Sequence, residues 1–348
     1  MNTLTQYGFT DRISGLFSFH FPIGAEPARV VRADRGRALL ASRHGLLHVD
    51  DGGGFVTGDW VALQGHDDRT VVGSLPRSSL LQRKRAHDPL SEAQVLGANM
   101  DLVGVVVPLD RPLSANRLER TLVAARDSGA LPIVILTKAD LSTRFDDVVA
   151  ETVERSRGVE VFTTSAQDQD GLEALRGRIG TGRTLALLGP SGAGKSSLIN
   201  ALVGRHRQDT GQVRAGDGRG RHTTTARELV PLGDGAVVMD TPGLRGFALW
   251  NAEDGLSQVF ADVEELFGDC RFRDCAHDSE PGCAVQAAIE SGALAERRWL
   301  SYLKMERELA SLHRRQSAAD QRRHARSFRQ AARGAATAKD YRNRFMEE

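Results

Sequence analysis

The apolar and polar positions of the N-terminal stretch alternate in short runs. Residues 1–75 contain ARVVRA, RALLAS, GLLHVD, DWVALQ and RTVVGSL, separated by Gly, Asp and Arg. Short strands at close spacing, with turn residues between them, are typical of a small barrel or sandwich. We therefore predict an OB-like β-barrel over residues 1–80, which either binds RNA or serves only as a scaffold.

From residue 99 the pattern changes to apolar strands that alternate with amphipathic helices. The runs DLVGVVVPL, PIVILTKAD, VEVFTTSA, TLALLG and AVVM are apolar enough to be buried strands. Helical patterns lie between them at NRLERTLVAARDSG, near residues 145–156 and 171–179, and at SSLINALVG. This alternation predicts an α/β domain over residues 81–250, with a mainly parallel sheet covered by helices.

Strand patterns disappear after residue 250, where a cysteine cluster is followed by a long segment rich in Ala, Arg, Glu and Leu. We predict an α-helical domain over residues 251–348. A chain of 348 residues is long enough for three domains. The composition, with 40% hydrophobic and 26% charged residues, is that of a globular protein rather than a disordered or fibrous one.

Membrane and secretory signals are missing from the sequence pattern. No segment approaches the roughly 18 apolar residues of a membrane span, and the start MNTLTQYGFT lacks the apolar core of a secretory signal. We expect a cytoplasmic protein with no membrane partner.

The net charge of +1 conceals an asymmetry along the chain. Residues 297–348 contain 14 Lys or Arg against 6 Asp or Glu, a balance of +8, which leaves −7 for residues 1–296. A basic tail on a mildly acidic body suggests a polyanionic partner such as nucleic acid. The alternative is an exposed, solvated helical face.

A phosphate-binding loop occupies residues 189–197. Its first eight residues, GPSGAGKS, fit G-x-x-x-x-G-K-S without a departure. Glycines let backbone N–H groups turn toward phosphate oxygens, and the following helix directs its positive end at the same anion. Lys195 would contact the β and γ phosphates, and the Ser196 hydroxyl would ligate Mg²⁺. The predicted nucleotide-binding residues of this loop are Gly189, Pro190, Ser191, Gly192, Ala193, Gly194, Lys195, Ser196 and Ser197.

A second motif narrows the class of nucleotide enzyme, because the loop alone would equally suit an ABC-type ATPase or a guanylate-kinase-like enzyme. Asp240, Thr241, Pro242 and Gly243 follow the apolar strand AVVM, and Asp240 stands 45 residues after Lys195. A carboxylate there can hold a water on Mg²⁺, and the Gly243 N–H can sense a γ-phosphate. D-x-P-G is typical of GTPase switch II, and the sequence has no LSGGQ-like signature of an ABC enzyme.

Guanine recognition is predicted upstream of the phosphate loop. The sequence TKAD at 137–140 follows the strand PIVIL and resembles N-K-x-D, in which Asp accepts from guanine N1 and N2 and Lys lies along the ring. The companion loop is TSA at 164–166. Both usually follow the phosphate loop, so the motif order is circularly permuted, which a sheet tolerates because strand position places each loop. The predicted base-binding residues are Thr137, Lys138, Ala139, Asp140, Ser165 and Ala166.

All three cysteines lie in one short stretch with a histidine. The spacing Cys270-x4-Cys275-x-His277-x5-Cys283 offers three thiolates and one imidazole within fourteen residues. These ligands close a tetrahedral Zn²⁺ shell with no open position, so a structural site is predicted. An odd, clustered set argues against disulfides, and the alternative is three buried free cysteines.

Together these motifs resemble the family of circularly permuted, small-ribosomal-subunit-dependent GTPases (RsgA, also called YjeQ or YloQ). The resemblance covers nearly the whole chain, with GRHTTTARELV as switch I, DTPGLR as switch II and the C-terminal cysteine motif. It implies a GTP hydrolase that the small ribosomal subunit stimulates. GTP-gated binding to rRNA would assist late maturation of that subunit. The implied cofactors are GTP or GDP, magnesium and one zinc per chain, and we expect a monomer.

The resemblance also points to residues for hydrolysis. Within GRHTTT at 220–225, the Thr224 hydroxyl is expected to complete the Mg²⁺ shell. Leu244 stands where Ras-like enzymes place a water-orienting Gln, so another group must act, and by resemblance His222 is the candidate. The alternative is that His222 is a solvent-exposed loop residue. The predicted catalytic residues are Lys195, His222, Thr224, Asp240 and Gly243.

Two departures from related sequences change the expectations. Thr137 replaces the usual Asn of the base motif, so guanine preference should survive through Asp140 while affinity can be weaker. Gly192 stands where potassium-activated relatives carry Asn, so no potassium requirement is predicted. Two other functions stay open at this point: a stand-alone P-loop ATPase or nucleoside-kinase-like enzyme, and a non-hydrolysing RNA-binding module that carries nucleotide.

Overall fold

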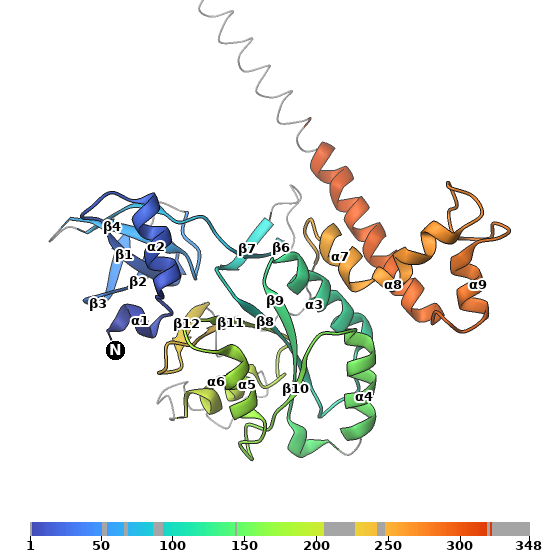
Figure 1. Cartoon of the computed structure of the whole chain (residues 1–348), viewed down its shortest axis with the longest axis horizontal. Coiled ribbons are helices and arrows are strands. Elements are labelled where there is room, and N and C mark those ends of the chain that lie inside the picture. The colour runs from blue at the N-terminus through green and yellow to red at the C-terminus, as the bar shows by residue number, and fades with distance from the viewer. Residues whose placement is uncertain are drawn as a thin grey trace, which may run out of the picture.

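The computed structural model describes residues 2–50, 54–65, 69–85, 93–142, 145–204, 227–241, 248–318 and 321. An N-terminal sheet, a central sheet with helices and a C-terminal group of helices follow one another across Figure 1. The order of these parts is the one expected from the apolar pattern. The division at residues 80 and 250 stays a prediction.

The N-terminal part is a five-stranded antiparallel sheet with the strand order β3-β2-β1-β4-β5. Residues of β2, of β3 and from the start of β5 line one cavity of about 490 Å³, so the two edges of the sheet curl toward each other, as in a partly open barrel. Each strand falls on one of the five apolar runs. The elements are α1 (Thr3–Gln6), α2 (Asp11–His20), β1 (Glu26–Asp34), β2 (Arg37–Ser42), β3 (Gly45–Asp50), β4 (Trp60–Gln64) and β5 (Thr70–Ser74).

A buried arginine joins this sheet to the central one. Arg29 of β1 is only 2% exposed, and its guanidinium lies 4.7 Å from the ring centre of Trp60. It donates to the carbonyl oxygen of Tyr7 (2.6 Å), the carbonyl oxygen of Asn99 (3.2 Å) and Oγ1 of Thr184 (2.8 Å). Burial lowers the pKa of Arg29 to about 10, so the group stays charged at neutral pH. These bonds compensate the buried charge and fix the barrel against the start of β11.

The central sheet has the strand order β10-β9-β8-β11-β13-β12. All neighbours pair in parallel except β12, which pairs antiparallel with β13 at the edge. The predicted mainly parallel sheet is therefore confirmed. The strands are β8 (Leu102–Pro108), β9 (Leu131–Thr137), β10 (Val161–Thr163), β11 (Thr184–Leu188), β12 (Glu228–Pro231) and β13 (Val237–Asp240), and a separate hairpin pairs β6 (Leu80–Lys84) with β7 (Ala93–Ala98).

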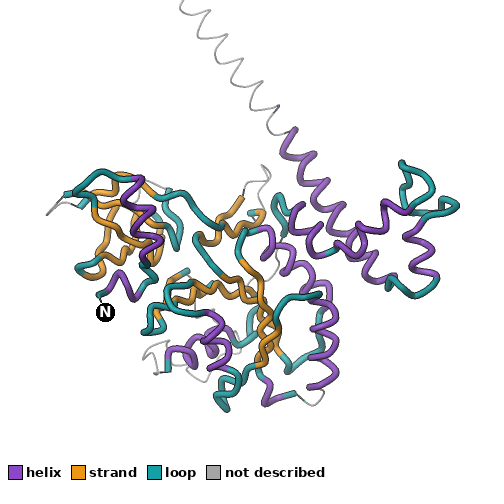
Figure 2. The backbone as a smooth tube through the Cα atoms, viewed as in Figure 1, coloured by secondary structure: helices purple, strands orange, loops and turns teal. Residues whose placement is uncertain are grey.

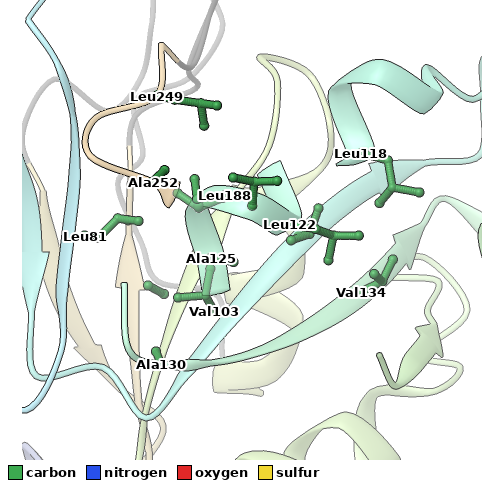
Figure 3. Packing of buried hydrophobic residues seen from close by; sticks show 14 of the residues in the cluster. Leu81, Val103, Leu118, Leu122, Ala125, Ala130, Val134, Leu188, Leu249 and Ala252 are labelled. Atoms are coloured by element: carbon green, nitrogen blue, oxygen red, sulfur yellow. The ribbon is translucent and has the colours of Figure 1, made fainter. Parts of the chain in front are cut away.

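Helices cover both faces of the central sheet, as Figure 2 shows. On one face, Leu118 and Leu122 of α3 pack against Val103 of β8 and Val134 of β9 (Figure 3). Leu118 and Leu122 are four residues apart, so they share one helix face, and each contributes roughly 1.5–3 kcal/mol on burial. The opposite face carries α5 and α6. The helices are α3 (Ala115–Asp127), η1 (Ala139–Leu141), α4 (Phe145–Ser156), α5 (Leu172–Ile179) and α6 (Lys195–Val203).

The described residues of the C-terminal part form helices joined by loops, and none of them forms a strand. Its elements are α7 (Glu253–Val259), α8 (Ala261–Glu264), η2 (Glu265–Asp269), α9 (Ala284–Glu290) and a helix described over residues 296–318. An interlocked group of aromatic rings, Phe260, Phe267, Trp299 and Tyr302, forms its centre. Among the helices of the described residues, none has the length and apolar character needed to cross a membrane.

A buried ionic network fastens the helix 296–318 to α3. Glu119 of α3 is fully buried and accepts hydrogen bonds from Arg297 (2.8 Å), Arg298 (3.3 Å) and the Ser301 hydroxyl (2.6 Å). Arg298 also forms a two-pronged pair with Asp262 at 2.9 and 2.7 Å. Planar arginine groups suit such two-pronged carboxylate pairs, so the C-terminal helices are held at a defined place on the central domain.

Candidate nucleotide site and metal centre

The predicted phosphate loop lies between β11 and α6, at the carboxyl end of the sheet. Gly192 and Gly194 have φ angles of +74° and +85°, which a side chain would make unfavourable. A Cβ on Gly189 would lie 2.8 Å from the carbonyl oxygen of Val106, so the loop passes too close to β8 for any larger residue. The apolar strand, the glycines and the helix start at Lys195 thus give the strand-loop-helix geometry that phosphate binding needs.

Lys195 is buried within this loop. Its ammonium group donates to the carbonyl oxygens of Gly189 (2.9 Å) and Pro190 (3.1 Å). Burial lowers the pKa of Lys195, and the negative charge of Asp240 partly offsets this shift. The lysine is therefore positioned inside the phosphate cradle. Ser196 and Ser197 at the first turn of α6 are exposed and can reach a ligand.

Thr137 links the predicted base motif to the phosphate loop. It ends β9, is 4% exposed, and its hydroxyl donates to the carbonyl oxygen of Ala193 at 2.7 Å. The Thr137 side chain thus forms a direct bond between the end of β9 and the phosphate loop. Replacement of Asn by Thr therefore leaves the phosphate loop tied to the end of β9.

Asp140 and the 164–166 loop face one cavity of about 580 Å³. The Ser165 hydroxyl donates to Oδ1 of Asp140 at 2.8 Å, which orients the carboxylate. The Ala139 N–H bonds to the carbonyl oxygen of Thr164 at 3.3 Å, so the two loops lie together. A cavity of this size suits a small ligand. Its lining contains Thr137, Lys138, Asp140, Thr164, Ala166, Gly194 and Ser197, together with Gln167, Gln169 and Asn200, which belong to none of the predicted motifs.

Lys138 has a partner that lies outside the nucleotide-binding motifs of the sequence. Its ammonium group pairs with Oδ2 of Asp110 at 2.6 Å, and Asp110 lies in the loop between β8 and α3. Arg111, the next residue, donates to the carbonyl oxygen of Gly192 in the phosphate loop at 3.1 Å. No standard motif includes this loop, and only the parallel pairing of β8 with β9 and β11 brings it to the site.

Asp240 ends β13 next to the phosphate loop. Strand β13 runs parallel to β11, and Met239 pairs with Ala186. Asp240, the next residue, therefore lies beside the end of β11, close to where the phosphate loop begins. The Thr241 hydroxyl, 1% exposed, donates to the carbonyl oxygen of Leu187 and fixes this strand end. The predicted residues His222, Thr224 and Gly243, and Leu244 with them, lie outside the described residues.

The predicted metal ligands form one cluster in the C-terminal part. One ligand atom from each of Cys270, Cys275, His277 and Cys283 lies within 4.8 Å of all the others. Nδ1 of His277 is 3.4 Å from the Cys270 sulfur and 3.7 Å from the Cys283 sulfur. Tetrahedral zinc with bonds of about 2.3 Å to S and 2.0–2.1 Å to N would separate these atoms by roughly 3.6 Å. The donor set and its spacing therefore fit Zn²⁺, while the identity of the metal stays a prediction.

Stacked rings orient the histidine of this cluster. The Phe267 ring stacks on His277 with centres 4.3 Å apart, and Trp299 meets it edge-on at 5.9 Å. His277 adopts a φ angle of +59°, which is uncommon for a side-chain-bearing residue. These contacts link the metal cluster to the helix 296–318, so metal binding and folding of this part should be coupled.

Comparison with known proteins places this fold and site in a family. A sequence model of the RsgA GTPase family matches residues 74–250. The Small ribosomal subunit biogenesis GTPase RsgA of Streptomyces coelicolor is 45% identical over 321 residues, 88% of this chain and 87% of that protein. The protein of the same name from Opitutus terrae is 40% identical over 339 residues, 90% of this chain and 91% of its own length. The chain belongs to the RsgA GTPase family.

Two solved structures share this fold. The structure of YloQ, a circularly permuted GTPase, has a TM-score of 0.59 at 24% identity and covers 84% of this chain and 97% of its own. YjeQ from Thermotoga maritima has a TM-score of 0.57 at 26% identity and covers 82% and 99%. The expected permuted GTPase fold is confirmed. GTPase activity, and with it guanine nucleotide and Mg²⁺, follows from membership of the RsgA GTPase family.

Proposed function

We propose that this chain is a GTP hydrolase that binds the small ribosomal subunit in the cytoplasm and assists its late maturation. The observation that carries the GTPase assignment is one cavity that joins the Asp140 carboxylate, the Lys138 stem and the phosphate loop. The subunit as partner rests on the relatives' names, which describe GTPases of small ribosomal subunit biogenesis.

The residues of the site suggest a division of labour. Asp140, oriented by Ser165, would accept hydrogen bonds from guanine N1 and N2, and a cavity with this acceptor disfavours adenine. Lys195 would place its charge at the β and γ phosphates, where negative charge develops during transfer. Mg²⁺ would be held by Ser196 and Thr224, with Asp240 acting through water, and it would neutralise phosphate charge.

Hydrolysis needs a group that orients the attacking water. We propose His222 of switch I for this role, since the side chain of Leu244 cannot donate or accept a hydrogen bond. A His222→Ala variant should then hydrolyse GTP more slowly on small subunits and bind GTP with unchanged affinity. Equal turnover of variant and parent would make His222 an ordinary loop residue.

The three predicted domains would act together on RNA. The sheet β1–β5 and the helices α7–α9 lie on opposite sides of the central sheet (Figure 1). They belong to the predicted barrel, residues 1–80, and to the predicted zinc-binding helical domain, residues 251–348, with the predicted GTPase domain, residues 81–250, between them in sequence. A protein that grips RNA at two places gains effective concentration at the second contact once the first is made. Switch segments that order around a γ-phosphate would time binding and release.

Sedimentation with purified ribosomal subunits tests this proposal. The protein should pellet with small subunits and not with large ones, and more strongly with a non-hydrolysable GTP analogue than with GDP. Binding should weaken steeply with salt, because phosphate contacts release counterions. A variant that ends after Leu309 lacks much of the basic tail and should show a shallower salt dependence. Failure to pellet in any nucleotide state would refute the ribosomal role and leave the GTPase assignment intact.

A further inference from the structure

A short loop outside the known motifs connects the two halves of the nucleotide site. It spans residues 109–114 between β8 and α3. Oδ2 of Asp110 accepts from the Lys138 ammonium at 2.6 Å, and Oδ1 accepts from Nε of Arg111 at 3.0 Å. The Arg111 guanidinium in turn donates to the carbonyl oxygen of Gly192 at 3.1 Å. A continuous chain of polar contacts therefore runs from the base motif, through two adjacent residues, to the phosphate loop.

Asp110 determines the direction in which the Lys138 side chain runs. Lys138 has a φ angle of +61°, a backbone conformation that few non-glycine residues adopt. Its stem passes close to the phosphate loop, since a Cβ on Gly194 would lie 3.8 Å from Cε of Lys138. Because Asp110 holds the ammonium group, the aliphatic part of the Lys138 side chain is already in the position where it would lie along a guanine ring. The Lys138 bond is the main reason that the pKa of Asp110 is lowered, so Asp110 is ionised at neutral pH.

The loop that carries the pair is itself fixed at both ends. At its start, the Leu109 N–H donates to the carbonyl oxygen of Thr137 at 2.9 Å. At its end, the Ser114 carbonyl oxygen accepts from the N–H groups of Arg117 and Leu118, each at 3.0 Å, in the first turn of α3. The buried Glu119 network then fixes α3 to the helix 296–318. The loop that carries Asp110 and Arg111 is therefore bonded to well-anchored elements at both ends.

We propose that Asp110 and Arg111 form a positioning clamp that sets the base motif and the phosphate loop at a fixed spacing before nucleotide binds. Asp110 holds the Lys138 stem in place for the guanine ring, and Arg111 holds the phosphate loop at Gly192. The clamp rests on the guanine-nucleotide binding of the proposed function. A long lysine that is already ordered loses less conformational freedom when the ligand arrives, so the clamp raises affinity for GTP and GDP alike. Its two side chains contact the site rather than the transferring phosphate, so the rate at saturating GTP is unaffected.

Nucleotide titration of an Asp110→Ala variant of the full chain tests the clamp. Ordering one flexible side chain is worth between about 2-fold and 12-fold in affinity, so the dissociation constants for GTP and GDP should both rise by that factor. The maximal rate at saturating GTP should stay within about twofold of the parent, which separates positioning from chemistry. Arg111→Ala should weaken binding in the same way. Glu154→Ala, which removes one negative charge from an exposed position of α4, is the matched control and should bind like the parent.

A double-mutant cycle with Lys138→Ala decides whether Asp110 acts through the lysine. If it does, Asp110→Ala has little further effect on affinity once Lys138 is replaced. Fully additive losses, parent-like affinity of either Asp110→Ala or Arg111→Ala, or a lower maximal rate with unchanged affinity would each overturn the clamp. Since Asp110 lies in a partly exposed loop, circular dichroism of each variant should match the parent. A parent protein that fails to bind guanine nucleotide would overturn the proposed function, whereas parent-like Asp110→Ala binding would overturn the clamp alone.

Discussion

Replacement of Glu119 by Gln tests how the C-terminal helix is attached to the GTPase domain. The Glu119 side chain is 0% exposed and accepts hydrogen bonds from Arg297, Arg298 and Ser301 at 2.8, 3.3 and 2.6 Å. Gln keeps the size and one acceptor oxygen but removes the negative charge. Its amide nitrogen also brings two donors into a site already filled with donors.

The expected loss can be worked out from these contacts. Removal of one partner from a fully buried ion pair costs about 3–5 kcal/mol. Here Arg298 keeps its two bonds to Asp262 and a third to the carbonyl oxygen of Val259 at 2.6 Å, so its charge stays partly compensated. We therefore expect Glu119→Gln to cost about 2–3 kcal/mol. This is the cost of removing one hydrogen bond to a charged group and leaving its buried donor without a partner.

Hydrogen exchange of the backbone amides in residues 296–318 measures this loss directly. Exchange through local opening reports the free energy that holds the helix in place, so the amides of the Glu119→Gln variant should exchange about 30- to 150-fold faster. Glu151→Gln is the control, because Glu151 pairs with Arg155 on the surface of α4 at 2.8 Å and is worth only about 0.3–0.5 kcal/mol. Equal exchange rates in the two variants would refute the view that this network anchors the helix.

Three further predictions concern specificity, metal and pH. Asp140→Asn should shift binding from guanine toward xanthine nucleotides by at least tenfold in competition titrations, because the amide no longer offers two acceptors to N1 and N2; an unchanged guanine preference would remove Asp140 from base recognition. A strong chelator should release one zinc per chain and change the fluorescence of Trp299, which lies 5.9 Å from the His277 ring, while GTP still binds; a chain that yields no metal would contradict the site. Burial, with the charges of Glu253 and Asp254, raises the pKa of Asp127 to about 7, so the protonated carboxyl is the form the fold prefers. Because this value lies above the unfolded value of about 3.9, that contribution to stability is lost as pH rises from about 4 to 7. Asp127→Asn should therefore be more stable than the parent at pH 8 and equal to it near pH 4, and urea unfolding that shows the same difference at both pH values would exclude this effect.

The parallel sheet could be predicted from sequence because its central strands are continuous apolar runs. β8 and β11 are buried at every position, which matches the continuous apolar runs DLVGVVVPL and TLALLG. The phosphate loop could be predicted equally well, because glycines at fixed spacing between a strand and a helix allow only one backbone path. The four metal ligands fall within fourteen residues, so short-range spacing was enough to bring them together.

Other features depend on contacts that no local pattern records. Helix α1 is only four residues long, and in α2 the apolar side chains of Leu16 and Phe19 are exposed. Leu4 and Ile13 are buried because the barrel lies against them. The edge strand β12 is four residues long, too short to show a period. Asp110 and Arg111 lie in an ordinary polar loop by sequence, and they reach the nucleotide site only because β8 lies between β9 and β11.

Phosphate release tests whether this chain is a guanine-specific hydrolase that acts on the small subunit. Steady-state rates with GTP and with ATP would be measured alone, with small subunits and with large subunits, and Lys195→Ala would give the background. We expect slow GTP turnover that only small subunits accelerate, no turnover of ATP above background, and no turnover by the variant. Equal turnover of GTP and ATP, or GTP turnover that small subunits leave unchanged, would contradict it.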